Sequence, residues 1–113
     1  MNEKVKELVS MDDWKVLLEK GTPTLLLKHS TTCPISAEAY NQFMAYVEGQ
    51  NSDNNVEFAL VKVIEMRPIS NQIAEDLQLK HESPQCVYMK NQEVAWSATH
   101  WNVTEEAIKE NVN

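Results

Sequence analysis

One cysteine lies where its thiol could act as a nucleophile. Cys33 follows an apolar run at residues 25–27 and precedes Pro34, which opens a segment with helical periodicity. A cysteine at the first turn of a helix lies beside backbone N–H groups that lack a partner and at the positive end of the helix dipole. Both effects favour the thiolate, which is the nucleophilic form. The sequence therefore predicts a single activated thiol at Cys33.

The residues around this cysteine limit the chemistry that it could perform. Ser36 lies three positions after Cys33, where a two-cysteine redox centre carries its second thiol, and Thr32, Pro34 and Ile35 complete the motif. Because a hydroxyl cannot form a disulfide, an active centre of this kind exchanges mixed disulfides with a separate thiol. The alternative is a small structural cysteine at a strand-to-helix junction.

Cys86 is the second of the two cysteines in the chain. It lies in an apolar segment, and free cysteine is among the most buried residue types, so a structural thiol is favoured. The alternative is a resolving thiol that closes a disulfide with Cys33. That bond requires Cα atoms within about 7 Å of each other, so the sequence leaves the choice open.

Length and charge restrict the classes of function. The 113 residues predict a single domain over 1–113, and the formal net charge of −7 argues against nucleic acid as a partner. No segment has the length and apolar character of a membrane span, and the charged N-terminus does not resemble a signal peptide. Together with the low cysteine content, these features predict a cytoplasmic protein with reduced thiols and no membrane association.

Apolar periodicity and turn residues predict eight elements. The first is a helical stripe that includes Val5, Leu8 and Trp14, with a start signal at Ser10 and a stop at Gly21. The others, in chain order, are a strand at 24–29, a helix at 34–48, a strand at 56–64, a helix from Pro68 to about 79, hairpin strands at 85–90 and 93–97, and a last helix capped by Asn102.

This order, with a strand–helix–strand unit first and an antiparallel hairpin last, resembles the thioredoxin-like fold. Residues 33–36 look like its active-site turn, and Ser83-Pro84 looks like the turn that carries its cis-proline. The resemblance implies an α/β domain with a four-stranded mixed sheet flanked by helices. It also implies a cis bond before Pro84 and a free backbone edge at Ser83 that pairs with an extended substrate. A trans proline that simply precedes a strand is the structural alternative.

Two stretches, residues 32–36 and 97–104, resemble those of the monothiol bacilliredoxins of the YtxJ type, which belong to the bacillithiol system. This resemblance implies a thiol–disulfide oxidoreductase that removes bacillithiol from protein mixed disulfides, with Cys33 as the attacking residue. It implies bacillithiol as co-substrate, bacillithiolated client proteins and a low-molecular-weight thiol as partners, and neither a bound cofactor nor a metal. His100 and Trp101 would contribute to substrate binding, Trp101 either as a wall of the thiol pocket or as a lid.

Other features bear on the identity of the thiol. Ser30 and residues 100–102 differ from the lysine and the Gly-Gly turn of many glutaredoxins, which argues against glutathione and against an iron–sulfur role. Bacillithiol carries carboxylates, so a cation or a helix N-terminus should meet it. The cationic candidates, each of which could instead be a solvated surface residue, are Lys28, His29, Lys80 and His81. A redox-silent module that binds a partner at Ser83-Pro84 is the alternative function.

Overall fold

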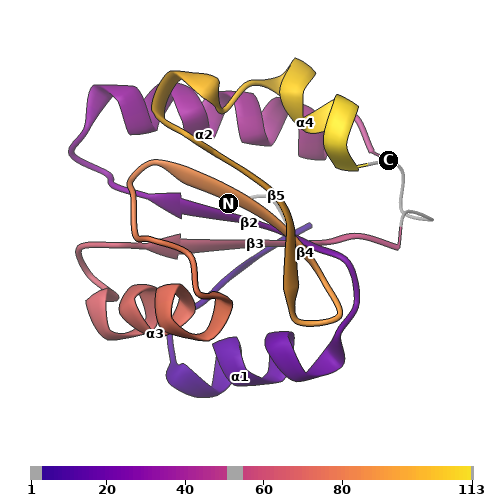
Figure 1. Cartoon of the computed structure of the whole chain (residues 1–113). Coiled ribbons are helices and arrows are strands. Elements are labelled where there is room, and N and C mark those ends of the chain that lie inside the picture. Colours follow the sequence, from indigo (N-terminus) through magenta and orange to yellow (C-terminus); the bar gives the residue numbers. More distant parts are fainter. Residues whose placement is uncertain (1–3, 51–54, 113) are drawn as a thin grey trace.

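The structure is a computed structural model that describes residues 4–50 and 55–112. Its elements are β1 (Val5–Glu7), α1 (Met11–Lys20), β2 (Thr24–His29), α2 (Pro34–Glu48), β3 (Glu57–Lys62), α3 (Arg67–Leu77), β4 (Gln85–Lys90), β5 (Glu93–Thr99), the 3₁₀ helix η1 (His100–Asn102) and α4 (Glu105–Val112). They form one sheet with helices on both faces (Figure 1).

The sheet has five strands in the order β1-β3-β2-β4-β5. Strands β1, β3 and β2 are mutually parallel, whereas β4 runs antiparallel to β2 and to β5. The central strand β2 has five buried residues in succession, because it has a strand on each side and helices over both faces. The α/β architecture and the mixed sheet agree with the sequence prediction, but the predicted number of four strands is wrong.

The additional strand is β1, and the sequence analysis placed its residues in a helical stripe. Val5 pairs with Phe58, and the N–H of Leu8 donates to Leu60 O at 2.8 Å, so this segment extends the sheet. The helix begins only after Ser10, whose Oγ accepts from Asp13 N–H at 3.1 Å. A three-residue strand is too short to show a period of two, so its apolar residue merged with the helical pattern that follows.

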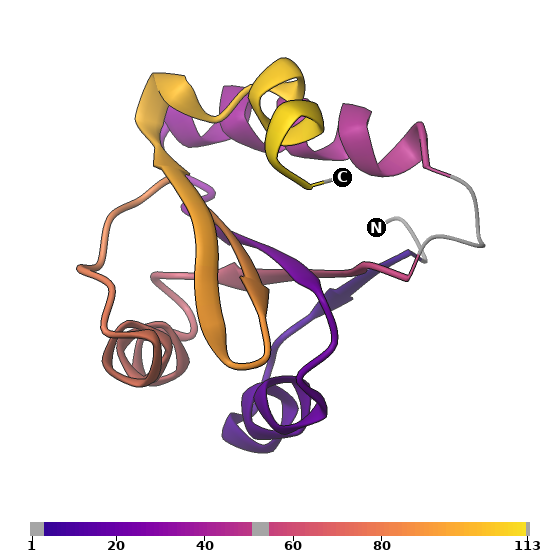
Figure 2. The same cartoon turned by 45° about the vertical axis from the view of Figure 1, so that its right-hand side comes forward.

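Helices α2 and α4 cover one face of the sheet and α1 and α3 the other (Figure 2). An apolar cluster lies between the sheet and the helices on each face. On one face α2 and α4 cover Leu25 and Leu27; on the other α1 and α3 cover Leu26. The side chains of β2 alternate between the two clusters, as the pleat of a strand requires. The C-terminal end of β2, from which the chain enters α2, therefore lies between the two apolar clusters.

The last helix starts differently from the prediction. Asn102 lies in η1, and Thr104 is the residue whose Oγ1 accepts from Ala107 N–H, at 3.1 Å. The predicted cap at Asn102 is therefore wrong by two positions. Strand β5 also continues to Thr99, two residues beyond the prediction, and leads directly into η1. This continuation brings η1, which begins at His100, to the end of the sheet where α2 begins (Figure 1).

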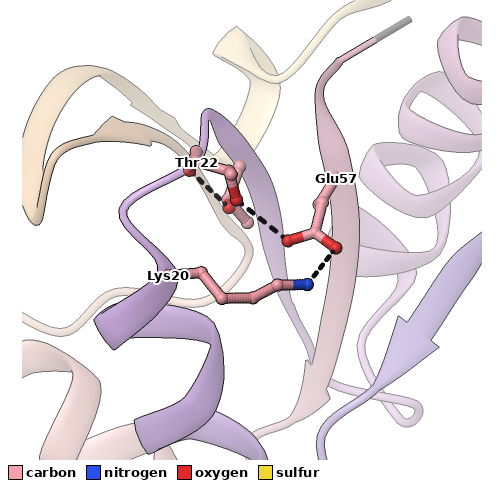
Figure 3. A network of polar contacts seen from close by, with 4 residues as sticks. Lys20, Thr22 and Glu57 are labelled. Atoms are coloured by element: carbon pink, nitrogen blue, oxygen red, sulfur yellow. Dashed lines mark hydrogen bonds and ion pairs between the residues drawn. The ribbon is translucent and has the colours of Figure 1, made fainter. Parts of the chain in front are cut away.

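A network of polar contacts stabilises the N-terminal end of β2 (Figure 3). Glu57, the first residue of β3, accepts from Lys20 Nζ at 2.9 Å and from Thr22 Oγ1 at 3.0 Å. Thr24 Oγ1 donates to Thr22 O at 3.0 Å. These contacts join the α1–β2 connection to the neighbouring strand and so fix where β2 starts.

We expect Glu57→Gln to destabilise the fold slightly, and only where the carboxylate is ionised. The hydrogen bond from Lys20 is the main cause that holds the pKa of Glu57 below its ordinary value. Such a group stabilises the fold above its unfolded pKa, and this stabilisation is lost as the pH falls through the folded pKa. Urea unfolding should show a loss of about 0.5 kcal/mol at pH 7 and almost none at pH 3, since the pair is partly exposed. Glu19→Gln is the matched control; an equal loss there would contradict the assignment.

Candidate functional site

Cys33 is the N-cap residue of α2, as the sequence predicted. Its side chain is partly exposed and makes no capping hydrogen bond, and Pro34 occupies the first turn of the helix. The backbone of Cys33 is fixed at both ends: its N–H donates to Ser30 O at 3.4 Å, and its carbonyl accepts from Ala37 N–H at 3.0 Å. The helix dipole and the first-turn amides therefore act on a thiol that solvent can reach.

Ser36 is completely buried and ties the active-site turn to β2. Its Oγ accepts from the N–H of Ser30 at 2.8 Å and lies 2.8 Å from His29 Nδ1. Because one lone pair is used by Ser30, the hydroxyl proton is free to donate to a neutral His29. Burial lowers the pKa of His29, which is consistent with that neutral state, and the ring stacks on Tyr40 with centroids 5.0 Å apart. Ser36 thus fixes the turn that presents Cys33.

We expect Ser36→Ala to destabilise the protein by about 1–3 kcal/mol. The substitution removes the acceptor of a buried backbone N–H at Ser30, and an unsatisfied buried donor costs that much. Chemical unfolding at neutral pH measures the loss. Ala37→Ser, which places a hydroxyl at the exposed neighbouring position, is the control and should leave stability within about 0.5 kcal/mol. A loss below that value in Ser36→Ala would show that the hydrogen bond is not structurally important.

The second motif forms the segment before β4. The Ser83–Pro84 peptide bond is cis, and Pro84 O accepts from His100 N–H at 3.0 Å. Gln85 Nε2 donates to Lys80 O at 3.1 Å, which ties down the start of the segment. Ser83 Oγ is buried and has no hydrogen-bond partner among the described residues. The segment is therefore anchored on both sides of Ser83, while Ser83 itself belongs to no strand pair.

Lys28 is the largest departure from the expected site. It is completely buried, and its Nζ donates to Ser70 O at 3.1 Å and to His81 Nδ1 at 3.2 Å. Burial lowers the pKa of Lys28 from 10.5 to about 8. The expectation of a solvated lysine is wrong because Lys28 faces the same side of the sheet as Leu26, under α3. A buried ammonium cannot contact the carboxylates of a ligand.

The other three cationic candidates have separate surroundings. His81 is exposed, but its Nδ1 lies 3.2 Å from Lys28 Nζ and 3.3 Å from Ser70 Oγ. Partial burial of the ring is the main cause that lowers its pKa. Lys80 has an 89% exposed side chain and lies 3.7 Å from the carboxylate of Glu82. The Nδ1 atom of His29 is already engaged with Ser36 Oγ, 2.8 Å away. Of the four, Lys80 and His81 have surface that a solution ligand could reach directly.

His100 and Trp101 lie in η1, which packs against α2. Trp101 is 66% exposed and lines a cavity between η1 and α2, so it forms a wall. The His100–Pro84 hydrogen bond places this wall beside the cis-proline segment. The structure thus brings together, at one end of the sheet, the start of α2, the segment before β4 and η1 (Figure 1). These segments carry the two motifs and the aromatic pair that the sequence singled out.

Cys86 lies in the core beneath α2, with no exposed surface. It pairs across the sheet with Leu27 and Ala98, and burial raises the pKa of its thiol above the ordinary value. Both cysteines are free. Cys86 therefore occupies the structural position that its apolar context favoured, and a resolving role would require it to leave the core.

The described residues contain no cluster of three or more His, Cys, Asp or Glu side chains that could hold a metal ion. Within the same part of the chain, no helix combines the length and the apolar character that crossing a bilayer requires.

The family-model comparison decides the identity. The model of the monothiol bacilliredoxin BrxC matches residues 6–108, which is nearly the whole chain. The chain belongs to the monothiol bacilliredoxin BrxC family. The matched residues include both motifs and the aromatic pair of η1. Membership of this family and of the wider thioredoxin-fold oxidoreductases makes thiol–disulfide exchange its class of chemistry.

Solved structures agree with the thioredoxin-like fold of this bacilliredoxin. One described as "A putative oxidoreductase with a thioredoxin fold" is 31% identical, with a TM-score of 0.84 over 97% of this chain and 95% of that one. Mitochondrial thioredoxin 3 of Saccharomyces cerevisiae is 12% identical, with a TM-score of 0.72 over 96% of this chain and 92% of that one. Thioredoxin of Malassezia sympodialis is 16% identical, with a TM-score of 0.75 over 100% and 97%. The last two show the fold alone.

Proposed function

We propose that this bacilliredoxin removes bacillithiol from mixed disulfides on client proteins through the Cys33 thiolate. The observation that carries the proposal is the pairing of a reachable thiol at the N-cap of α2 with a buried hydroxyl at Ser36. Ser36 cannot resolve a mixed disulfide, and Cys86 is enclosed in the core. The centre is therefore suited to exchange with an outside thiol.

The proposed cycle has two exchange steps. The Cys33 thiolate attacks the bacillithiol sulfur of a protein mixed disulfide; that S–S bond breaks, and the client thiolate leaves and takes a proton from water. Cys33 is then joined to bacillithiol. A second molecule of bacillithiol, as thiolate, attacks the bacillithiol sulfur of this intermediate, releases the Cys33 thiolate and leaves as bacillithiol disulfide. Bacillithiol supplies both electrons, and no bound cofactor takes part.

The fold also offers a surface for the client. An extended peptide could pair with the backbone at Ser83, because this residue precedes β4 and belongs to no strand pair. His100 holds the other side of the segment through Pro84 O. Recognition through the main chain would admit clients of varied sequence, which suits a protein that repairs many thiols in the cytoplasm.

Intact mass spectrometry of the reduced protein after exposure to bacillithiol disulfide tests the proposal. We expect a single bacillithiol adduct that a second addition of bacillithiol removes. Ser36→Cys is the informative control: it places a thiol three residues after Cys33 on the helix, within disulfide range, so the adduct should give way to a loss of two mass units. The same loss in the native protein would make Cys86 the resolving thiol. The absence of any adduct would favour a redox-silent binding module.

A further inference from the structure

A cavity of about 510 Å³ lies between α2 and η1. Glu38 and Gln42 form its α2 side, and His100 and Trp101 form its η1 side. Glu38 follows Cys33 by five residues, which corresponds to about 7.5 Å along the helix axis. The hydrogen bond from His100 N–H to Pro84 O joins the opposite wall to the cis-proline segment. The cavity therefore adjoins the place where Cys33 would exchange disulfides.

The α2 wall of the cavity is held by Gln42. Its Nε2 donates to Glu38 Oε2 at 3.0 Å, and its Oε1 accepts from Glu105 N–H at 2.8 Å, at the start of α4. Both ends of the amide are thus used, Nε2 within α2 and Oε1 in joining α2 to α4. Glu38 keeps one carboxylate oxygen, Oε1, without a hydrogen bond among the described residues. The cavity presents a fixed carboxylate that can still accept from a ligand.

The η1 wall carries a backbone outlier and an exposed aromatic ring. His100 has φ of +53°, a left-handed conformation that is unfavourable for residues other than glycine and that is concentrated at functional sites. Val103, two residues after Trp101, is buried in the core, whereas Trp101 itself is 66% exposed. The short helix thus presents a large indole to solvent at the mouth of the cavity, although burial of that ring would be favourable.

These features indicate the chemistry of the ligand. A flat, open indole face accepts the C–H face of a saturated ring, and a carboxylate accepts hydrogen bonds from hydroxyl groups at the edge of such a ring. No lysine or arginine lines the cavity, and Glu38 would repel an anion placed beside it. A neutral polyhydroxylated ring, such as a pyranose, matches this surface better than an anion or a fully apolar group.

We propose that this cavity binds the glucosamine ring of bacillithiol, with the ring against Trp101 and its hydroxyls near Glu38. The inference rests on the proposed function and makes it more specific. Bacillithiol joins a cysteine to the nitrogen of glucosamine, so its sugar is separated from the sulfur by a few bonds only. When that sulfur meets Cys33, the adjoining cavity is within reach. The malate group of bacillithiol would then point away from Glu38, toward solvent.

Two substrates that share one peptide test this assignment. The same model peptide is prepared with a bacillithiol and with a cysteine mixed disulfide, so that only the sugar and the malate differ. We expect Trp101→Ala to raise KM for the bacillithiolated peptide by about tenfold and Glu38→Gln by about threefold, both with little change for the cysteinylated peptide. Trp101→Phe, which keeps an aromatic face, should recover most of the loss. An equal rise for both substrates would mean that the cavity binds the client peptide, and would overturn the proposal.

A binding measurement without thiol chemistry separates the proposal from the proposed function. Glucosaminyl malate, which lacks the cysteine, is titrated against the native protein while the indole N–H resonances are followed; Trp101→Phe identifies the signal of Trp101. A saturable shift of that signal, weakened in Glu38→Gln, supports the sugar site even if Cys33 exchanges no disulfide. An unshifted signal alongside normal exchange of bacillithiol overturns the sugar site and leaves the proposed function standing.

Discussion

Cys33→Ser should abolish the release of bacillithiol from a mixed disulfide, with a fall in rate of about a thousandfold or more. A serine hydroxyl is not ionised at neutral pH, so the first-turn amides and the helix dipole have no thiolate to stabilise. The serine side chain is close in size to cysteine and lies at a partly exposed N-cap, a position that serine favours. The variant should therefore lose its activity without losing stability. Release of bacillithiol from a model peptide and the urea midpoint measure the two quantities.

Cys86→Ala is the matched control for this experiment. Cys86 has no exposed surface, and burial disfavours its thiolate, so it cannot replace Cys33 as the nucleophile. We expect the alanine variant to keep its activity within about twofold and to lose about 1 kcal/mol of stability through the small cavity that it creates. If Cys86→Ala instead loses the activity while it remains folded, the resolving role of Cys86 is restored and the monothiol cycle is wrong.

The main elements and the active-site turn could be predicted because the signals are local. Pro34 and the apolar period gave α2 with the bounds that the structure has, and Ser10 with Gly21 gave the ends of α1. Strand β1 was missed because its stability comes from pairing with β3, which lies about fifty residues away in the sequence. A short strand that is stabilised mainly by pairing with another strand shows no distinct hydrophobic pattern in its own sequence.

The arrangement of the site depended on contacts that no local pattern contains. The sequence could suggest that Ser36 replaces a thiol, but not that its hydroxyl holds Ser30 and His29. The cavity was missed for the same reason, since Gln42 reaches Glu105 across 63 positions. For Lys28 there was a signal: it lies inside a run of residues with the continuous apolar pattern of a fully buried strand. The charge of Lys28 led to the expectation of a surface position.

Lys28→Met should stabilise the protein at neutral pH. No ion pair compensates the Lys28 ammonium among the described residues, and burial lowers its pKa from 10.5 to about 8. Each pKa unit corresponds to about 1.4 kcal/mol, so keeping this lysine charged costs as much as about 3 kcal/mol. Methionine has a similar length and volume and needs no proton. The substitution also leaves no buried polar atom without a partner. Ser70 Oγ can still donate to His81 Nδ1, and Ser70 O lies within α3, where the backbone of the helix provides a donor.

The pH dependence identifies the cause. The folded pKa of Lys28 lies below the unfolded one, so between about pH 8 and 10.5 the unfolded chain holds a proton that the folded chain has released. The stability of the native protein therefore rises with pH in this window, because the unfolded state binds more protons. Urea unfolding should show that Lys28→Met gains about 1–3 kcal/mol at pH 7 and that this gain shrinks by pH 10. Lys15→Met, on the exposed face of α1, should change little at either pH. A loss of stability in Lys28→Met at pH 7 would mean that the contacts of the ammonium with Ser70 and His81 outweigh its desolvation.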